Sequence, residues 1–157
     1  MTEAAPQTLE DLLTAVLGTT AISMKRSLDE VVVEIDRGNI REACMRVKMD
    51  TGLDIDYLRC LSGVDYPDRF EVIYHLHSTR MGHRVVFKVR LPKDDPSIDS
   101  VTPVWRGANW HEREARDMFG IRFVGHPDPR ILLLMEGQED EHPLLKSYRL
   151  ARLRKTY

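Results

Sequence analysis

The sequence has few cysteines, no long apolar run and little net charge, and each scarcity excludes a class of protein. Its 157 residues contain two cysteines, Cys44 and Cys60, which are too far apart for a CxxC metal or redox motif. No apolar stretch approaches the roughly 20 residues that span a bilayer, and the acidic N-terminus has no signal-peptide pattern. A net charge of -2 offers no general attraction for nucleic acid or anionic lipid. We therefore expect one domain in a reducing compartment, with both cysteines in its core.

Apolar periodicity predicts an α+β fold, in which helices pack on one face of a mostly antiparallel sheet. A short helix begins at Thr8 and ends at Gly18, and residues 19–29 read as a linker. The pattern then predicts a strand at 31–35, a helix from Asn39 to Gly52, strands at 55–62, 70–77 and 84–91, and a helix at 110–119. This order is β-α-β-β-β-α, and Gly82 marks a hairpin between the last two strands.

Composition divides the chain into three parts. Residues 1–28 are the N-terminal helix and linker, residues 29–128 are the α+β domain, and residues 129–157 are an extended tail. Within this segment an acidic run precedes an end that carries only basic charges, among them Lys146, Arg149, Arg152, Arg154 and Lys155. It has little core of its own to join, so it is expected to lie on another protein or to stay mobile. Contact with anionic lipid is the alternative for its basic charges.

The helix at 110–119 is dense in charge, and its spacing argues against catalysis. Asn109 at the N-cap and Glu112 at N3 match a capping box, and Gly120 suits the left-handed position after the helix. Two oppositely charged pairs are spaced i,i+4, namely Glu112 with Arg116 and Arg113 with Asp117. Glu112 and Glu114, being two residues apart, point to different sides and cannot flank one bond as acid and base.

Glu114 is the exception to this surface interpretation. It follows Trp110 and precedes Met118 at i,i+4 on an otherwise apolar stripe. A carboxylate there is costly to bury without a cation, so we infer a pair with an arginine of this chain or of a neighbour. The alternative is a solvated position at the helix edge. Trp105, Trp110 and Phe119 are expected in the core, and the extended arm after Gly120, stiffened by prolines, is suited to docking.

These residues resemble a known family. Trp110, Glu112-Arg113-Glu114, Asp117-Met118-Phe119-Gly120-Ile121, Phe123 and Gly125-His126-Pro127-Asp128 look like the signature of the C-type subunit of respiratory complex I, the NADH dehydrogenase 30-kilodalton family. The likeness extends upstream through Ser100-Val101 and Trp105, and onward to His142-Pro143-Leu144. Related chains occur in membrane-bound hydrogenases and formate hydrogenlyases, which are the alternative within this resemblance.

The resemblance implies a non-catalytic subunit of a proton-pumping NADH:quinone oxidoreductase. Such a subunit holds no iron-sulfur cluster, flavin or quinone, which belong to its partners, and it packs against subunits of types B, D and I. It would sit peripherally on the cytoplasmic face of the cell membrane and reach the membrane only through the complex. The interface signature implied is Trp110, Glu112, Arg113, Glu114, Asp117, Phe119, Gly120, Phe123, Gly125, His126, Pro127 and Asp128. No catalytic, cofactor-binding or metal-binding residue is expected.

Two other classes compete with this interpretation. His75, His77 and His83 are close enough in sequence for a zinc-binding hydrolase domain, although no fourth ligand has diagnostic spacing. A sheet backed by helices could also display aromatic residues to single-stranded RNA. Tyr74 and Phe87, however, alternate with the valines of their strands and are expected in the core.

Overall fold

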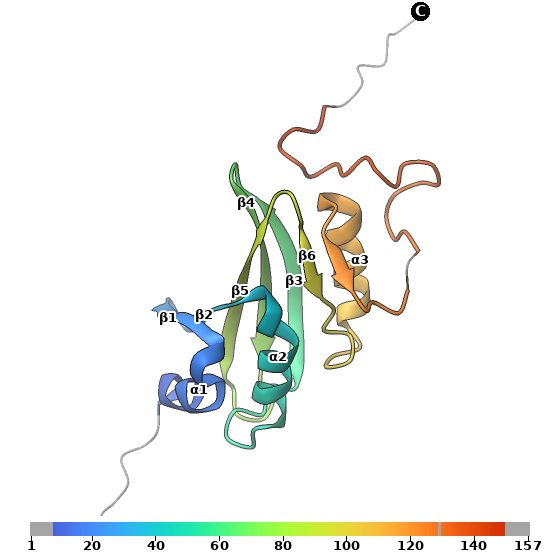
Figure 1. The fold of residues 1–157 in the computed structure, drawn as a ribbon. Coiled ribbons are helices and arrows are strands. Elements are labelled where there is room, and N and C mark those ends of the chain that lie inside the picture. Colours follow the sequence, from blue (N-terminus) through green and yellow to red (C-terminus); the bar gives the residue numbers. More distant parts are fainter. Residues whose placement is uncertain (1–7, 129, 150–157) are drawn as a thin grey trace, which may run out of the picture.

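A five-stranded sheet organises the chain. The computed structural model describes residues 8–128 and 130–149. The strands β1 (Ala21–Ser27), β2 (Glu30–Ile35), β3 (Tyr57–Asp65), β4 (Arg69–His77) and β5 (Arg84–Pro92) lie in the order β1-β2-β5-β4-β3 (Figure 1). All neighbouring strands are antiparallel except β2 and β5, which run parallel with Val33 opposite Phe87. The predicted α+β class with a mostly antiparallel sheet is confirmed.

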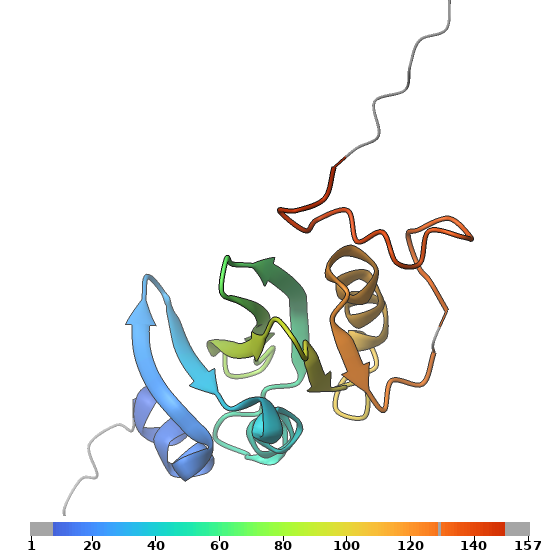
Figure 2. The same cartoon turned by 45° about the horizontal axis from the view of Figure 1, so that its top comes forward.

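Two helices cover one face of this sheet (Figure 2). Helix α1 (Leu9–Leu17) begins with a capping box, in which Thr8 and Asp11 bond each other's backbone N–H groups, and Gly18 follows it with φ 53°. A 3₁₀ turn, η1 (Gly18–Thr20), leads from α1 into β1. Helix α2 (Ile40–Met49) follows a second 3₁₀ turn, η2 (Arg37–Asn39), which Asp36 caps. The predicted start at Asn39 is right in position, but its side chain makes no capping bond and the helix ends before Gly52.

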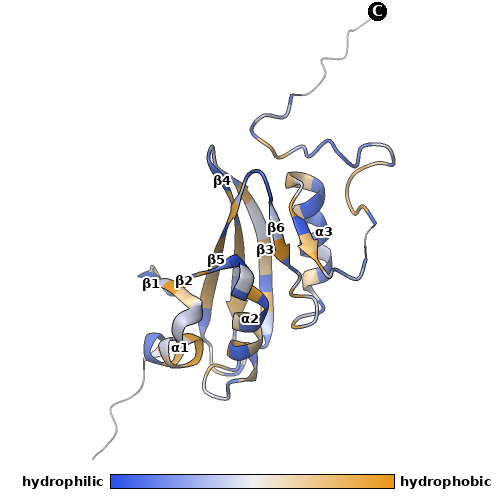
Figure 3. Cartoon of the chain, in the orientation of Figure 1, coloured by the Kyte–Doolittle hydropathy of each residue, from blue (hydrophilic) through white to orange (hydrophobic). Residues whose placement is uncertain are grey.

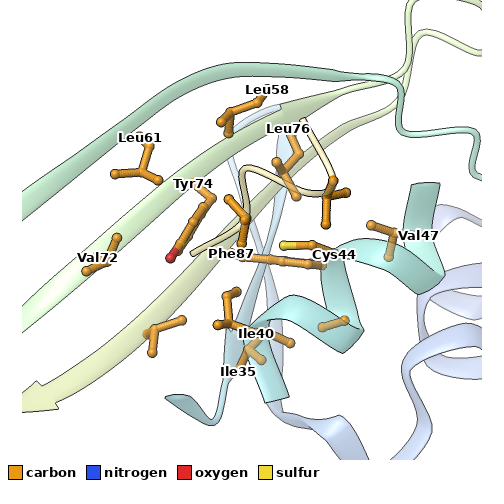
Figure 4. Close-up of a cluster of buried hydrophobic side chains, with 14 of the residues drawn as sticks. Ile35, Ile40, Cys44, Val47, Leu58, Leu61, Val72, Tyr74, Leu76 and Phe87 are labelled. Atoms are coloured by element: carbon orange, nitrogen blue, oxygen red, sulfur yellow. The ribbon is translucent and has the colours of Figure 1, made fainter. Parts of the chain in front are cut away.

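The core lies between α2 and the sheet. Figure 4 shows Ile40, Cys44 and Val47 of α2 facing Tyr74, Leu76 and Phe87 of the strands, and all six are at most 1% exposed. Leu13 and Leu17 of α1 join the same core. Figure 3 shows both hydrophobic and hydrophilic residues along the strands. Burial alternates in β2, where every second side chain is buried. The prediction that Tyr74, Phe87 and Cys44 are core residues is confirmed, whereas Cys60 is only half-buried.

The linker predicted at 19–29 is wrong. Most of it forms β1, which pairs with β2 along nearly its whole length. Five of the seven side chains of β1 are exposed, so this edge strand lacks the apolar alternation from which strands are recognised. The strand predicted at 55–62 lies at 57–65. Leu53 and Ile55 are buried like strand residues, but they lie before Tyr57, where the pairing with β4 begins.

The final elements build a smaller layer beside β3. Helix α3 (Ala108–Phe119) packs along β3, and the short parallel strands β6 (Ser97–Asp99) and β7 (Arg122–Val124) pair next to it (Figures 1 and 2). Gly63 of β3 allows this approach, since a Cβ there would stand 2.7 Å from the Phe119 ring. Within the described residues, no helix has the length and apolar character to cross a membrane.

Candidate functional site

The candidate site is formed by α3, the arm (residues 121–128) and the C-terminal segment (residues 130–149). Glu112 lies at its centre and is 0% exposed. One carboxylate oxygen accepts a hydrogen bond from Ser100 Oγ (2.6 Å), and the other accepts one from the N–H of Val101 (2.7 Å). Glu112 therefore fastens α3 to the loop after β6. Because Ser100 is itself fully buried, this hydroxyl cannot reach a substrate as a nucleophile.

The predicted capping box of Asn109 and Glu112 is wrong. Helix α3 begins at Ala108 after Gly107, and no side chain caps it. Its entry is instead bonded through the backbone, where the carbonyl of Val101 accepts from the N–H of Trp105 and the carbonyl of Trp105 accepts from that of Ala108. The Glu112 carboxylate is consequently free to turn inward. No spacing rule connects Glu112 with Ser100, so sequence reasoning missed this contact.

Burial controls the ionisation of Glu112. It raises the pKa of this carboxyl to about 7, against the opposing effects of the Ser100 and Val101 hydrogen bonds and of the Arg41 charge. The unfolded carboxyl titrates near its ordinary value of 4.5. The folded chain thus keeps a proton over a pH range in which the unfolded chain has lost it.

We expect Glu112 to make folding stability fall as pH rises. Its contribution is complete below the unfolded pKa of 4.5 and is lost as pH approaches the folded pKa of about 7. The loss amounts to about 3 kcal/mol between these values. Urea unfolding of wild type and Glu112→Gln between pH 4 and 8 measures it as the difference between the two curves. Glu114→Gln, which changes an exposed carboxylate on the same helix, is the matched control and should run parallel to wild type. Parallel curves for Glu112→Gln would contradict the expectation.

Arg113 and Asp117 hold the C-terminal segment rather than each other. Arg113 donates to the carbonyls of Arg130 (2.9 Å) and Ile131 (2.7 Å), and it lies 3.3 Å from an Asp128 oxygen. Asp117, 2% exposed, accepts from the N–H groups of Leu132 (2.7 Å) and Leu133 (2.9 Å). Burial alone would raise the pKa of Asp117, but these two N–H groups and Arg116 lower it overall.

The two predicted i,i+4 pairs are therefore wrong. Glu112 turns into the core, and the other pair divides its hydrogen bonds along four consecutive residues of the C-terminal segment. Only tertiary structure could reveal this, because the bonded groups are backbone atoms, which carry no residue-specific signal in the sequence.

His126 joins the arm to α3. Its Nδ1 accepts from the N–H of Asp128 (3.0 Å), so Nε2 carries the proton. Nε2 lies 3.2 Å from the carbonyl of Asn109, to which it donates, and 3.8 Å from a Glu112 oxygen. The prediction of a hydrogen-bonding loop histidine is confirmed. Hydrogen bonds from Arg130, together with the nearby Arg113, hold the pKa of Asp128 well below its usual range.

The end of α3 is closed by Gly120 and His142. Gly120 has φ 74°, as predicted, and a Cβ there would stand 2.8 Å from His142 Nε2. His142 in turn is bonded through Nδ1 to the carbonyl of Asp117 (2.9 Å), and Leu144 N–H donates to the carbonyl of Met118 (3.1 Å). The described part of the predicted tail, residues 130–149, is thus fastened to its own chain, while Arg152, Arg154 and Lys155 lie outside the described residues.

The outer side of α3 is exposed. Glu114 is exposed and forms no ion pair within the described ranges, so the predicted buried pair inside this chain is wrong. Trp110 is 62% exposed rather than in the core, whereas Trp105 is 5% exposed as predicted. Exposed apolar side chains continue along the C-terminal segment, at Leu133, Met135 and Leu144. We call Trp110, Glu114, Leu133, Met135 and Leu144 the outer surface.

The remaining signature residues support the arm. Phe119 packs on Gly63, and Phe123 is 7% exposed. Gly125 has φ 79°, and a Cβ there would stand 3.2 Å from the Arg41 guanidinium. A hollow of about 450 Å³ lies between the loop at Thr102–Pro103 and the arm, where it is lined by Gly125 and Pro127.

Glu112 is buried and Glu114 is exposed, so these two carboxylates do not face a common site. Within the described residues no three potential ligands gather as a metal site. His77 and His83 bond backbone carbonyls instead, and His75 lies 3.7 Å from Glu30. His75, His77 and His83 therefore do not gather as a zinc ligand set in the described part of the chain.

Comparison with known proteins gives a consistent family. The family model described as "Respiratory-chain NADH dehydrogenase, 30 Kd subunit" matches residues 33–153. The C 2 subunit of NADH-quinone oxidoreductase from Rhizobium etli (strain CIAT 652) is 45% identical, over 84% of this chain and 65% of its own length. The chain spans between 44% and 65% of the length of four curated relatives that are 45% to 50% identical to it.

Two solved structures share the fold. The trypsin-resistant fragment (1-134) of Nqo5 is 31% identical with a TM-score of 0.66, covering 76% of this chain and 98% of that one. A chain of the membrane-bound sulfane sulfur reductase, an archaeal respiratory membrane complex, has a TM-score of 0.75. It is 22% identical and covers 90% of this chain and 85% of that one, a likeness of fold alone.

Proposed function

This chain belongs to the family of the 30 Kd subunit of respiratory-chain NADH dehydrogenase, and from this premise we propose that it is a structural subunit of a proton-pumping NADH:quinone oxidoreductase. The assembly passes electrons to a quinone. This chain contributes no catalytic group and stabilises the subunits that carry the iron-sulfur clusters and line the quinone site.

The outer surface is the observation that carries this proposal. Trp110 is 62% exposed and Leu133 59%, although Trp110 lies in an α-helix and the N–H of Leu133 donates to Asp117. Met135, two residues after Leu133, is 69% exposed. Exposed tryptophan on a rigid backbone is typical of interface anchors. The buried charges of α3 thus order the segments that present apolar side chains to partners, and Glu114 pairs with an arginine of a neighbouring subunit.

The partners we propose are subunits of types B, D and I. The iron-sulfur clusters, flavin and quinone belong to other subunits of the complex, and this chain reaches the membrane only through them, at its cytoplasmic face. Family membership and the Nqo5 likeness support an assembly of this type.

Purification of a tagged chain from detergent-solubilised membranes, with mass spectrometry of the partners, tests the proposal. We expect subunits of types B, D and I to be recovered with the chain. Recovery of a monomer alone, or of a chain that turns over a reactant by itself, would refute the structural role.

Trp110→Ala and Glu114→Gln should each reduce recovery of the partners without unfolding the chain. For Trp110→Ala we expect about a tenfold weaker association, the usual effect of removing an interface tryptophan. Met49→Ala, which truncates a 71% exposed side chain at the end of α2, is the control and should leave recovery unchanged. Normal recovery with Glu114→Gln would favour the solvated position for that carboxylate.

A further inference from the structure

The sheet face opposite α1 and α2 contains a groove with no helix in its lining. It consists of a hollow of about 490 Å³ and an adjoining hollow of about 390 Å³, which share Val32, Tyr66 and Lys88. Every lining residue belongs to a strand of the sheet or to a turn between strands. The groove is therefore distinct from the outer surface on α3 and the C-terminal segment.

The smaller hollow is basic, although the chain as a whole carries a net charge of -2. Its two carboxylates are already paired, Glu34 with Arg90 (3.1 Å) and Glu71 with Arg69 (2.9 Å). Its charged lining is Lys25, Arg69, Lys88 and Arg90 against Glu34 and Glu71. Neither Lys25 nor Lys88 forms an ion pair within the described part of the chain.

Lys88 occupies the middle of the groove. It lies on β5, the central strand, with Glu34 of β2 and Ile73 of β4 as its neighbours across the sheet. Glu34 bonds Arg90 instead, so within the described residues Lys88, which is half-buried as a residue, has no carboxylate partner. An unpaired cation on a half-buried side chain gains when an anion is placed beside it.

The larger hollow is more apolar, and Leu28 stands at its rim. Val32, Val64, Ile73 and Val86 contribute to its lining. Leu28, at the tip of the β1–β2 hairpin, is 94% exposed and has φ 54°. Left-handed backbone is unfavourable for leucine, by about 1–2 kcal/mol, and glycine is usual at this turn position. Neither the conformation nor the exposure of Leu28 helps the isolated chain to fold.

We propose that this groove docks an acidic segment of another polypeptide of the assembly, with a carboxylate on Lys88 and apolar side chains against Ile73 and Leu28. The inference rests on the proposed function, since the partner is sought within that assembly. A protein segment fits better than nucleic acid, because Val64, Ile73 and Val86 line the larger hollow beside its charged residues, whereas a phosphate chain needs an unbroken row of cations. The charge excess of the smaller hollow determines the sign of the partner.

Carbodiimide coupling of the purified complex tests the proposal, because this reagent joins an amine only to a carboxylate in contact with it. We expect Lys88 to be linked to an Asp or Glu of another polypeptide. We also expect a water-soluble, amine-reactive acylating reagent to modify Lys88 about tenfold more slowly in the complex than in the free chain, because the ion pair shields its amine. Lys88→Arg keeps the charge and should retain assembly while losing the coupled product.

Leu28→Gly separates docking from folding. It relieves the backbone strain, so the free chain should be no less stable, but coupling at Lys88 should decrease several-fold. Unchanged reactivity of Lys88 in an intact complex overturns this inference alone. A link to a second copy of this chain, or protection of the free chain by anionic vesicles, overturns the choice of another polypeptide of the assembly as the occupant. Recovery of the chain without partners overturns the proposed function as well.

Discussion

Gly120→Val should abolish assembly of the complex while the sheet and its core stay folded. A β-branched side chain at φ 74° is strained by about 1–2 kcal/mol. In addition, its Cβ would stand 2.8 Å from His142 Nε2, so His142 must leave the carbonyl of Asp117. The bond from Leu144 to Met118 would be lost with it, and the C-terminal segment would no longer hold Leu144 in its place on the outer surface. Recovery of the tagged complex and circular dichroism of the free variant measure the two effects.

Gly82→Val is the matched control for this expectation. Gly82 also has φ 74°, but a Cβ there meets no atom of the described residues within 4 Å. It therefore introduces the same backbone strain without displacing a neighbour, and assembly should survive. Equal loss of assembly in both variants would attribute the effect to strain alone, and normal assembly with Gly120→Val would contradict the role of His142.

Asp117→Ala should release the C-terminal segment from α3. Two N–H groups, those of Leu132 and Leu133, would lose a buried acceptor, and each such loss costs about 1–3 kcal/mol. We expect proteolysis of the free chain near residues 130–135 to become at least tenfold faster and the complex to fail to form. Limited proteolysis with mass spectrometry, followed by native electrophoresis of solubilised membranes, measures both.

Asp50→Ala serves as its control. Asp50 likewise accepts two backbone N–H groups, those of Gly52 and Leu53, but in the loop between α2 and β3. Its loss should destabilise the chain by a similar amount without exposing residues 130–135. Identical proteolysis patterns for the two variants would show that global unfolding, and not the loss of the Asp117 bonds, causes the cleavage.

The sequence predicted what depends on local rules. The alternation of β5 and the left-handed Gly120 follow from side-chain period and backbone sterics, and both are confirmed. The start of α3 was missed because backbone bonds from Val101 and Trp105, not a side chain, open the helix. The strand β1 was missed because most of its side chains are exposed and none is fully buried, so apolar and polar residues do not alternate along it.

Glu112 and Glu114 show the limit of sequence-based prediction most directly, because the one predicted to be exposed is buried and the one predicted to be buried is exposed. Both are glutamates on one helix, and the neighbouring Trp110 and Met118 favoured Glu114 as the buried one. The helix is instead oriented so that Glu112 meets Ser100 and Val101, and Trp110 faces outward. An interface residue looks like a core residue in a sequence, because the partner that covers it is another chain.

The parallel pairing of β2 with β5 also determines when the chain can fold during synthesis. Val33 can pair with Phe87 only after roughly 50 further residues have been translated. Until then the β1–β2 hairpin and α1 cannot pack on the rest of the sheet. This late contact is also the one that unites the two halves of the sheet. A nascent chain released before Pro92 would expose the apolar side of β2 to chaperones and proteases, and cellular quality control would therefore act on this polypeptide before any partner could.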